Sequence, residues 1–371
     1  MSEIPETQRA WIIERRGLPS KALTLRTDWK VPSKLKPGEV LVKVQAAALN
    51  PVGYKLMRVL PNFAHSGRPL PAEYDLSGVI VDGNGTEFSN GDQVFGYVST
   101  GGCGPGFYLY NNLQNLSELS QATSQGALAE YVRMPADHLV LRPPNVSPIE
   151  ASGITLVGQT AYEGLIDFGQ LEAGQTVLIN GGSSAVGAYA IQIAKAKGAK
   201  VVATASGKNE QFVRNLGADE FIDYTKAPLH QYLTEHPPSP KFHVILDAVG
   251  LIDPSLYTHS PAYLAPNGIF VSTGPMPHST SASELWKTVK TGFHCFLLPT
   301  WLGGTKRQYK IFLVKNKKST LETLQKMVAD GSIKPPVDSV YEFEDVLKAY
   351  DRIMSSRATG KVVVKVDPTV T

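Results

Sequence analysis

Cysteine is scarce in this sequence: its 371 residues include two, Cys103 and Cys295. They stand far apart and outside any Cys-x-x-Cys spacing, which excludes a disulfide framework and a structural zinc site built from cysteines. Long apolar runs are also missing. The stretch 293–298 stops at Pro299, well short of the roughly 20 residues that a membrane span needs.

A surplus of one charge is absent too. Lys and Arg total 36 against 33 Asp and Glu, and no long basic run occurs, which argues against a nucleic-acid partner. The first residues include Glu3 and Glu6 and no apolar run, unlike a secretory signal or a transit peptide. With 42% hydrophobic residues the composition is that of a globular protein, and we expect a cytoplasmic one without a membrane partner.

The hydrophobic periodicity of the sequence changes along the chain. The first part has short alternating strands separated by turn signals and prolines, which is typical of a β-rich domain. From residue 148 a helical segment (148–168) is followed by strands that alternate with helices, which predicts βαβ units and a parallel sheet. A closing strand is predicted at 361–366. We therefore predict an α/β protein with a β-rich domain (1–147 and 310–371) and a doubly wound domain (148–309).

A dinucleotide-type turn opens the doubly wound domain. The chain runs strand, glycine turn, helix, strand, and a helix N-terminus offers unpaired N–H groups and a positive dipole end to a pyrophosphate. The pattern is Gly182-x-Ser184-x-x-Gly187, with serine at the middle glycine of GxGxxG. A tight turn that only packs is the alternative, but the two flanking strands favour a nucleotide site. Its predicted contacts are Gly182, Ser183, Ser184, Ala185 and Val186.

The end of the second strand indicates which coenzyme is used. NAD sites usually carry Asp or Glu there to hold the ribose hydroxyls. Here the strand ends in Ser206-Gly207-Lys208, with no acid before Glu210. A hydroxyl and an ammonium would hold a 2′-phosphate. We therefore predict NADPH, with Ser206 and Lys208 at the phosphate; a solvated lysine at a helix start is the alternative.

Several stretches carry a family resemblance, and they run almost end to end. They are AAALNPVGYK, LSGVIVDGNGTEFSNGDQVFGY, GALAEYV, TLVGQTAY, LGADEFIDY, LDAVG and ATGKVVVKV. The chain resembles the medium-chain dehydrogenase/reductase superfamily, in its zinc-free quinone oxidoreductase and enone or enoyl reductase branch. The resemblance implies a GroES-like catalytic domain interrupted by a Rossmann domain, with the coenzyme in the cleft between them.

The resemblance also implies chemistry without a metal. Where the zinc enzymes of the family place a first cysteine ligand this chain has Asn50, and where they place a His-Glu pair it has Tyr74-Asp75. The third ligand position falls near Leu156, and the structural zinc lobe is absent. A catalytic zinc needs about three protein ligands, so we expect no metal. The expected reaction is hydride transfer to the β-carbon of an α,β-unsaturated carbonyl compound.

Roles at the reacting centre follow from the same resemblance. Asn50 matches a residue beside the nicotinamide ribose, and its amide is expected to donate a hydrogen bond to the charge that develops on the carbonyl oxygen. Tyr54 is the candidate proton donor; the alternatives are a packed aromatic there and protonation by water. Many relatives carry Asp where this chain has Gly53, so no role of that acid is carried over to this chain.

Other residues match positions around the coenzyme. The expected contacts are Thr160 facing the nicotinamide, Tyr224 near the adenosine phosphate, and Val249, Gly250 and Thr273 in loops that follow later strands. Lys361 is expected to reach a phosphate or, as a strand-edge lysine, to face solvent.

The substrate itself is not readable from the sequence. Residues 101–124 and 293–304 are expected to wall a pocket for an apolar small-molecule acceptor. Quinone reduction and a trans-acting enoyl reductase for a carrier-bound polyketide are the alternative activities. A non-enzymatic nucleotide-binding protein is a further alternative, since a fold does not fix a function. Monomer and homodimer both remain open.

Overall fold

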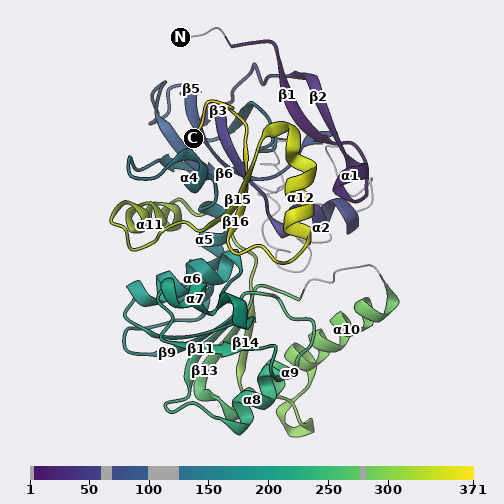
Figure 1. The fold of residues 1–371 in the computed structure, drawn as a ribbon, viewed down its shortest axis with the longest axis vertical. Helices are drawn as coiled ribbons and strands as arrows, with labels where there is room; N and C mark the ends of the chain where they lie inside the picture. The colour runs from purple at the N-terminus through teal and green to yellow at the C-terminus, as the bar shows by residue number, and fades with distance from the viewer. Residues whose placement is uncertain (1–3, 60–68, 99–124, 276–280) are drawn as a thin grey trace. The chain divides into compact units, whose positions relative to one another are not determined.

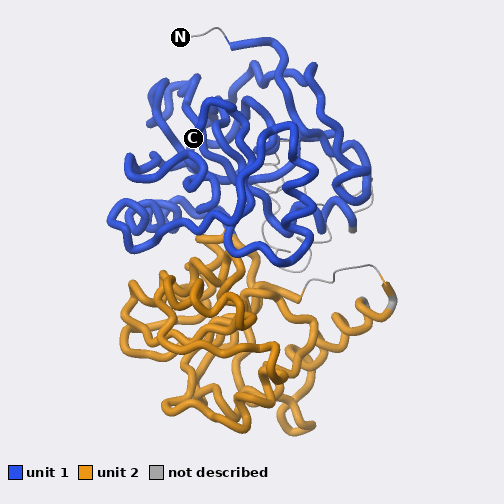
Figure 2. Tube along the Cα trace, in the orientation of Figure 1, with its two compact units in different colours: residues 1–156, 315–371 blue, residues 157–314 orange. Residues whose placement is uncertain are grey.

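The computed structural model describes residues 4–59, 69–98, 125–275 and 281–371 (Figure 1). Two compact units make up the chain: unit 1 contains residues 1–156 and 315–371, and unit 2 contains residues 157–314 (Figure 2). The predicted doubly wound domain began at residue 148. Helix α4 (Pro148–Ser152) belongs to unit 1 instead, because it packs on strands β3 and β5 of that unit.

Unit 1 is built on β-sheets, as its turn-rich sequence predicts. Its larger described sheet has the order β15-β16-β3-β5-β6-β8, with β7 also paired to β3. Its strands are β3 (Glu39–Ala48), β5 (Asp75–Asp82), β6 (Gln93–Tyr97), β7 (Tyr131–Pro135), β8 (Leu139–Leu141), β15 (Val337–Tyr341) and β16 (Lys361–Lys365). A smaller described sheet has the order β2-β1-β4, with β1 (Thr7–Ile13), β2 (Leu23–Lys30) and β4 (Leu70–Pro71).

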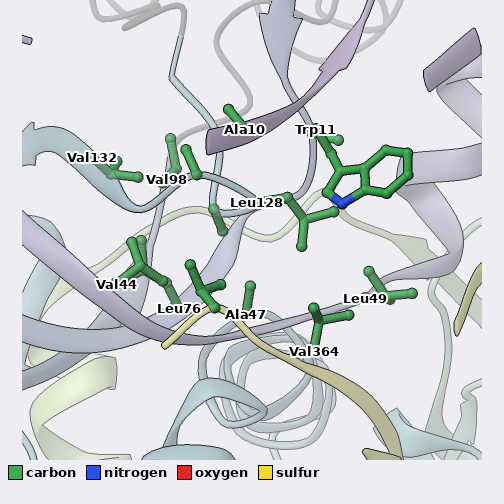
Figure 3. Close-up of a cluster of buried hydrophobic side chains, with 14 of the residues drawn as sticks. Ala10, Trp11, Val44, Ala47, Leu49, Leu76, Val98, Leu128, Val132 and Val364 are labelled. Atoms are coloured by element: carbon green, nitrogen blue, oxygen red, sulfur yellow. The ribbon is translucent and has the colours of Figure 1, made fainter. Parts of the chain in front are cut away.

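The core of unit 1 joins the two ends of the chain. Alternate residues of β3, Val40, Val42 and Val44, are buried in one cluster. Period-two alternation puts these side chains on one face of the sheet. Figure 3 shows Val44 in this cluster with Trp11 of β1 and Val364 of β16. The unit also carries helices α1 (Pro19–Ala22), α2 (Pro51–Val59), α11 (Lys318–Ala329) and α12 (Val346–Met354).

Unit 2 holds the predicted parallel sheet. Six strands of the described chain run parallel in the order β11-β10-β9-β12-β13-β14. They are β9 (Thr176–Asn180), β10 (Lys200–Ala205), β11 (Glu220–Asp223), β12 (Phe242–Asp247), β13 (Leu264–Ser272) and β14 (Gln308–Ile311). Helices include α6 (Ala185–Ala196), α7 (Glu210–Asn215), α8 (Leu229–Glu235), α9 (Ser255–Thr258) and α10 (Ala282–Gly292). The predicted fold class is confirmed.

The helical pattern over 148–168 folds as three pieces rather than one helix. Ser147 and Glu150 form a reciprocal capping box at the start of α4, and Gly153 ends it. Helix α5 (Thr155–Tyr162) and a π-helical turn (Glu163–Phe168) follow. Within the described residues, no helix has both the length and the apolar character needed to span a membrane.

Candidate functional site

The predicted phosphate turn lies at the carboxyl end of β9 in unit 2. The strand ends at Asn180, the backbone reverses at Gly181 with a φ of 84°, and α6 begins at Ala185. Ser184 caps the helix: its hydroxyl accepts a hydrogen bond from the Gly187 N–H at 3.0 Å. The other first-turn N–H groups of the helix have no partner within it, which is the arrangement that binds anions.

Bare backbone is required in this turn. A Cβ atom at Gly187 would lie 2.1 Å from the Gly181 carbonyl oxygen, and one at Gly181 would lie 2.4 Å from a methyl carbon of Val249. The missing side chains thus bring the turn, the helix start and the loop after β12 together. These residues fit a dinucleotide pyrophosphate, and the structure places Gly182, Ser183, Ala185 and Val186 in this turn and the start of α6.

A buried carboxylate that the sequence analysis did not single out organises the neighbouring loops. Asp247, at the end of β12, accepts hydrogen bonds from the backbone N–H groups of Val249, Gly250 and Leu251. It also accepts from the Asn180 amide at 3.0 Å and from the Ser272 hydroxyl at 3.1 Å.

These contacts tie the carboxyl ends of the three adjacent strands β9, β12 and β13 to one side chain. Burial raises the pKa of Asp247, while its N–H and hydroxyl donors oppose that rise. Strand order reverses between β9 and β12, and open α/β sheets bind ligands at such a point. The signal was an Asp directly after an apolar strand, in LDAVG.

A lysine, Lys208, and a carboxylate, that of Asp223, both lie at the turn after β10. Ser206 and Lys208 lie there, and the Asn209 amide donates to the Ser183 hydroxyl at 3.2 Å, which ties the turn to the phosphate cradle. The neighbouring strand brings a carboxylate that the sequence analysis missed: a Cβ at Gly207 would lie 2.7 Å from Asp223 Oδ2. The Thr225 hydroxyl and N–H lower the pKa of Asp223, so it is ionised at neutral pH.

The remaining predicted coenzyme residues of unit 2 lie in several places. Tyr224 follows β11, and its ring and the Val249 side chain are both about half exposed. The Thr273 N–H donates to the Asp247 main-chain oxygen at 3.1 Å, which places Thr273 beside the loop that holds Gly250. Thr160 lies on α5, which precedes the first strand of this sheet, β9, in the chain.

Unit 1 contains a buried polar cluster around Asn50. The Lys361 ammonium donates to Asn50 Oδ1 at 2.7 Å and to Asp75 Oδ2 at 3.0 Å. The Asn50 amide donates to Asp75 Oδ2 at 3.1 Å and to the Ala48 carbonyl at 3.3 Å, and the Leu156 N–H donates to Asp75 Oδ1 at 2.9 Å. Two of the positions that the resemblance matches to zinc ligands, 50 and 75, therefore contact an ammonium, and the third, near Leu156, donates its backbone N–H to the same Asp75 carboxylate.

Two expectations about this cluster need correction. Lys361 is 2% exposed, so it is not a strand-edge lysine in solvent; β16 lies between β15 and β3, and a buried carboxylate holds the ammonium in place of a phosphate. Asn50 is fully buried, and both N–H groups of its amide already have acceptors. In this arrangement Asn50 has no spare N–H for a developing oxyanion.

A second buried carboxylate, that of Glu73, accepts a hydrogen bond from the backbone of Asn50. Glu73 Oε2 accepts from the Asn50 N–H at 3.1 Å, and Glu73 Oε1 accepts from the Tyr350 hydroxyl of α12 at 2.7 Å. Burial raises the pKa of Glu73 to about 7; the Tyr350 hydroxyl, the Lys361 charge and the Asn50 N–H oppose the rise. No pattern in the sequence pointed to Glu73, because its partners are remote along the chain.

Tyr54 lies on α2, four residues after Asn50, and packs in part against the core of unit 1. Burial raises the pKa of its phenol, so the hydroxyl keeps its proton at neutral pH. Both the packed aromatic and the proton donor are compatible with this position.

The two predicted pocket walls have different outcomes. Residues 101–124 lie outside the described residues. The other segment exposes its apolar side chains: Leu297 is 69% and Trp301 80% exposed, so this part of unit 2 presents an apolar surface. In the part of the chain that the structure describes, no three His, Cys, Asp or Glu side chains are grouped to hold a metal ion.

Comparison with known proteins agrees with these features. Residues 36–144 match the family model described as an alcohol dehydrogenase GroES-like domain, and residues 216–364 match one described as a zinc-binding dehydrogenase. The chain is 32% identical to the trans-enoyl reductase poxH of Penicillium oxalicum, over 97% of this chain and 98% of that protein. The chain belongs to the medium-chain dehydrogenase/reductase superfamily.

Other members match over nearly the whole chain. The NADPH-dependent alkenal/one oxidoreductase of Arabidopsis thaliana is 31% identical over 98% of this chain and 81% of that protein. A crystal structure of an alcohol dehydrogenase superfamily protein from Novosphingobium aromaticivorans has a TM-score of 0.75 and 27% identity, covering 97% of this chain and all of that one. This medium-chain reductase is thus an oxidoreductase of a family that binds a nicotinamide coenzyme.

Proposed function

We propose that this chain is an NADPH-dependent reductase of the C=C bond of apolar α,β-unsaturated carbonyl compounds. The observation that carries the proposal is the bare backbone cradle at the start of α6, where Gly187 leaves no room for a side chain. Similarity of more than 30% to an enoyl reductase and an alkenal/one oxidoreductase along nearly the whole chain supports the substrate class.

When bound, the coenzyme supplies a hydride for the β-carbon of the acceptor. The first turn of α6 would hold the pyrophosphate through its N–H groups, and Asp247 orients the loops that carry Val249 and Gly250. Ser206 and Lys208 would hold the 2′-phosphate. The Tyr54 hydroxyl keeps its proton at neutral pH and can deliver it to the α-carbon; water is the alternative proton source.

Acceptor specificity tests the reaction. NADPH consumption is followed with crotonaldehyde, cyclohexenone, crotonyl-CoA, menadione and butanal, each with and without a chelator. We expect turnover with the conjugated carbonyl compounds and no effect of the chelator. Turnover of butanal alone would contradict C=C reduction, turnover of menadione alone would favour quinone reduction, and loss of activity with the chelator would contradict a metal-free reaction.

The coenzyme preference has a separate test. Because Lys208 is exposed at the turn after β10, Lys208→Ala should raise the KM for NADPH about tenfold and leave the KM for NADH nearly unchanged. Lys226→Ala, at another exposed lysine beyond β11, serves as the matched control. Equal changes for the two coenzymes would argue against a 2′-phosphate contact at Lys208.

A further inference from the structure

Helix α2 has no acidic residue at its third position, where an acid could cap the start of the helix. Asn50 precedes the helix, Pro51 occupies its first position, and Gly53 occupies its third. In a capping box, an acidic side chain at the third helical position accepts a hydrogen bond from the backbone N–H of the residue before the helix. Gly53 has no side chain with which to do this.

Glu73 makes that hydrogen bond from outside the helix. Its Oε2 accepts from the Asn50 N–H, and it precedes β5 with a φ of 62°, a left-handed conformation that is uncommon for a residue other than glycine. A Cβ built at Gly53 would lie 2.4 Å from Glu73 Oε1 and 3.0 Å from its carboxyl carbon. The Glu73 carboxylate therefore occupies the space of a side chain at position 53.

We propose that Glu73 is a positioning residue of the reductase site, which caps α2 through the Asn50 N–H in place of an acid at position 53 and so holds Tyr54. The backbone of Asn50 is held by Glu73, and its side chain by Asp75 and Lys361. Tyr350 of α12 holds the other oxygen of Glu73, so the cap is tied to the core of unit 1. This inference rests on the proposed function for its effect on turnover.

Moving the carboxylate between the two positions tests the proposal. Glu73→Gly removes the acid and relieves the left-handed backbone, Gly53→Asp supplies an acid at the third helical position, and the double variant does both. We expect each single variant to lower kcat about tenfold, because small displacements of reacting groups have effects of that order. The double variant should return to within about threefold of the original kcat, with the Kd for NADPH unchanged throughout.

Thermal unfolding supplies a readout that needs no activity. Each single variant should lower Tm by about 5 °C and the double variant should recover most of that loss, since residues in contact show coupled effects. Gly292→Asp, at a glycine with open space around it, and Gln170→Gly, at a φ of 53°, make similar changes in unit 2 as matched controls.

The outcomes separate the two proposals. Recovery of both kcat and Tm in the double variant supports the positioning role. Recovery of Tm without kcat would reduce Glu73 to a structural residue and overturn the proposal, and so would single effects on Tm that simply add. If the original chain reduces none of the acceptors, the proposed function fails, while the Tm cycle still decides whether Glu73 stands in for a side chain at position 53.

Discussion

Glu73→Gln should make unit 1 more stable than the original chain at alkaline pH and remove a pH dependence. The pKa of Glu73 is raised from 4.5 to about 7, chiefly by burial, so the folded chain binds a proton that the unfolded chain has already released. The contribution of this group to stability is therefore full below about pH 4.5 and is lost as pH rises through about 7. At roughly 1.4 kcal/mol per pKa unit, the loss amounts to about 3 kcal/mol.

Glutamine keeps the shape of the protonated side chain and has no proton to release. Its carbonyl can accept from the Asn50 N–H, and its amide can donate to the Tyr350 hydroxyl oxygen. The stability of Glu73→Gln relative to the original chain should thus increase by about 2 to 3 kcal/mol between pH 5 and pH 8.

Hydrogen exchange reports this difference for unit 1 alone. Exchange of peptides from β3 and β16, corrected for the intrinsic pH dependence of exchange, gives the free energy of opening at each pH. Glu344→Gln, at an exposed carboxylate of the same unit, is the matched control and should show no such trend. A stability difference between Glu73→Gln and the original chain that stays constant from pH 5 to pH 8 would refute the reasoning.

Three further predictions concern buried or crowded groups. Lys361→Met leaves the Asp75 carboxylate buried without its cation and should lower the free energy of chemical unfolding by about 3 to 5 kcal/mol. Lys365→Met on the same strand should lower it by less than about 1 kcal/mol. Similar losses in the two variants would contradict the buried pair. Asp247→Asn places an amide N–H against backbone donors and should weaken NADPH binding about tenfold in a fluorescence titration, which unaltered binding would disprove. Gly187→Ala forces a methyl group against a carbonyl oxygen and should abolish that binding; a normal Kd would show that the cradle is not used.

The sequence predicted much of unit 2 because the relevant signals are local. The predicted order of strand, glycine turn, helix and strand matches β9, the turn at Gly181, α6 and β10. The glycine turn between β9 and α6 could be read as well, since strand, turn and helix follow one another directly along the chain.

Contacts between distant segments were beyond the sequence analysis. The neighbours of Lys361 along the chain say nothing about which strands flank β16, so the sequence left both a phosphate contact and a solvent-exposed strand edge open. The pairing of β16 between β15 and β3 is decided in three dimensions, and it buries the ammonium against Asp75. In the same way, Asp223 reaches Gly207 only because β11 pairs in register with β10.

By itself, the sequence determined the class of fold, the order of the elements and the place of the phosphate turn. Hydrogen bonding and apolar periodicity within a segment depend on neighbouring residues and therefore leave a pattern in the chain. Only the tertiary structure decided which charges share the interior of unit 1. A buried carboxylate selects its partners by distance in space, and Glu73, Asn50 and Tyr350 meet although they are far apart in sequence.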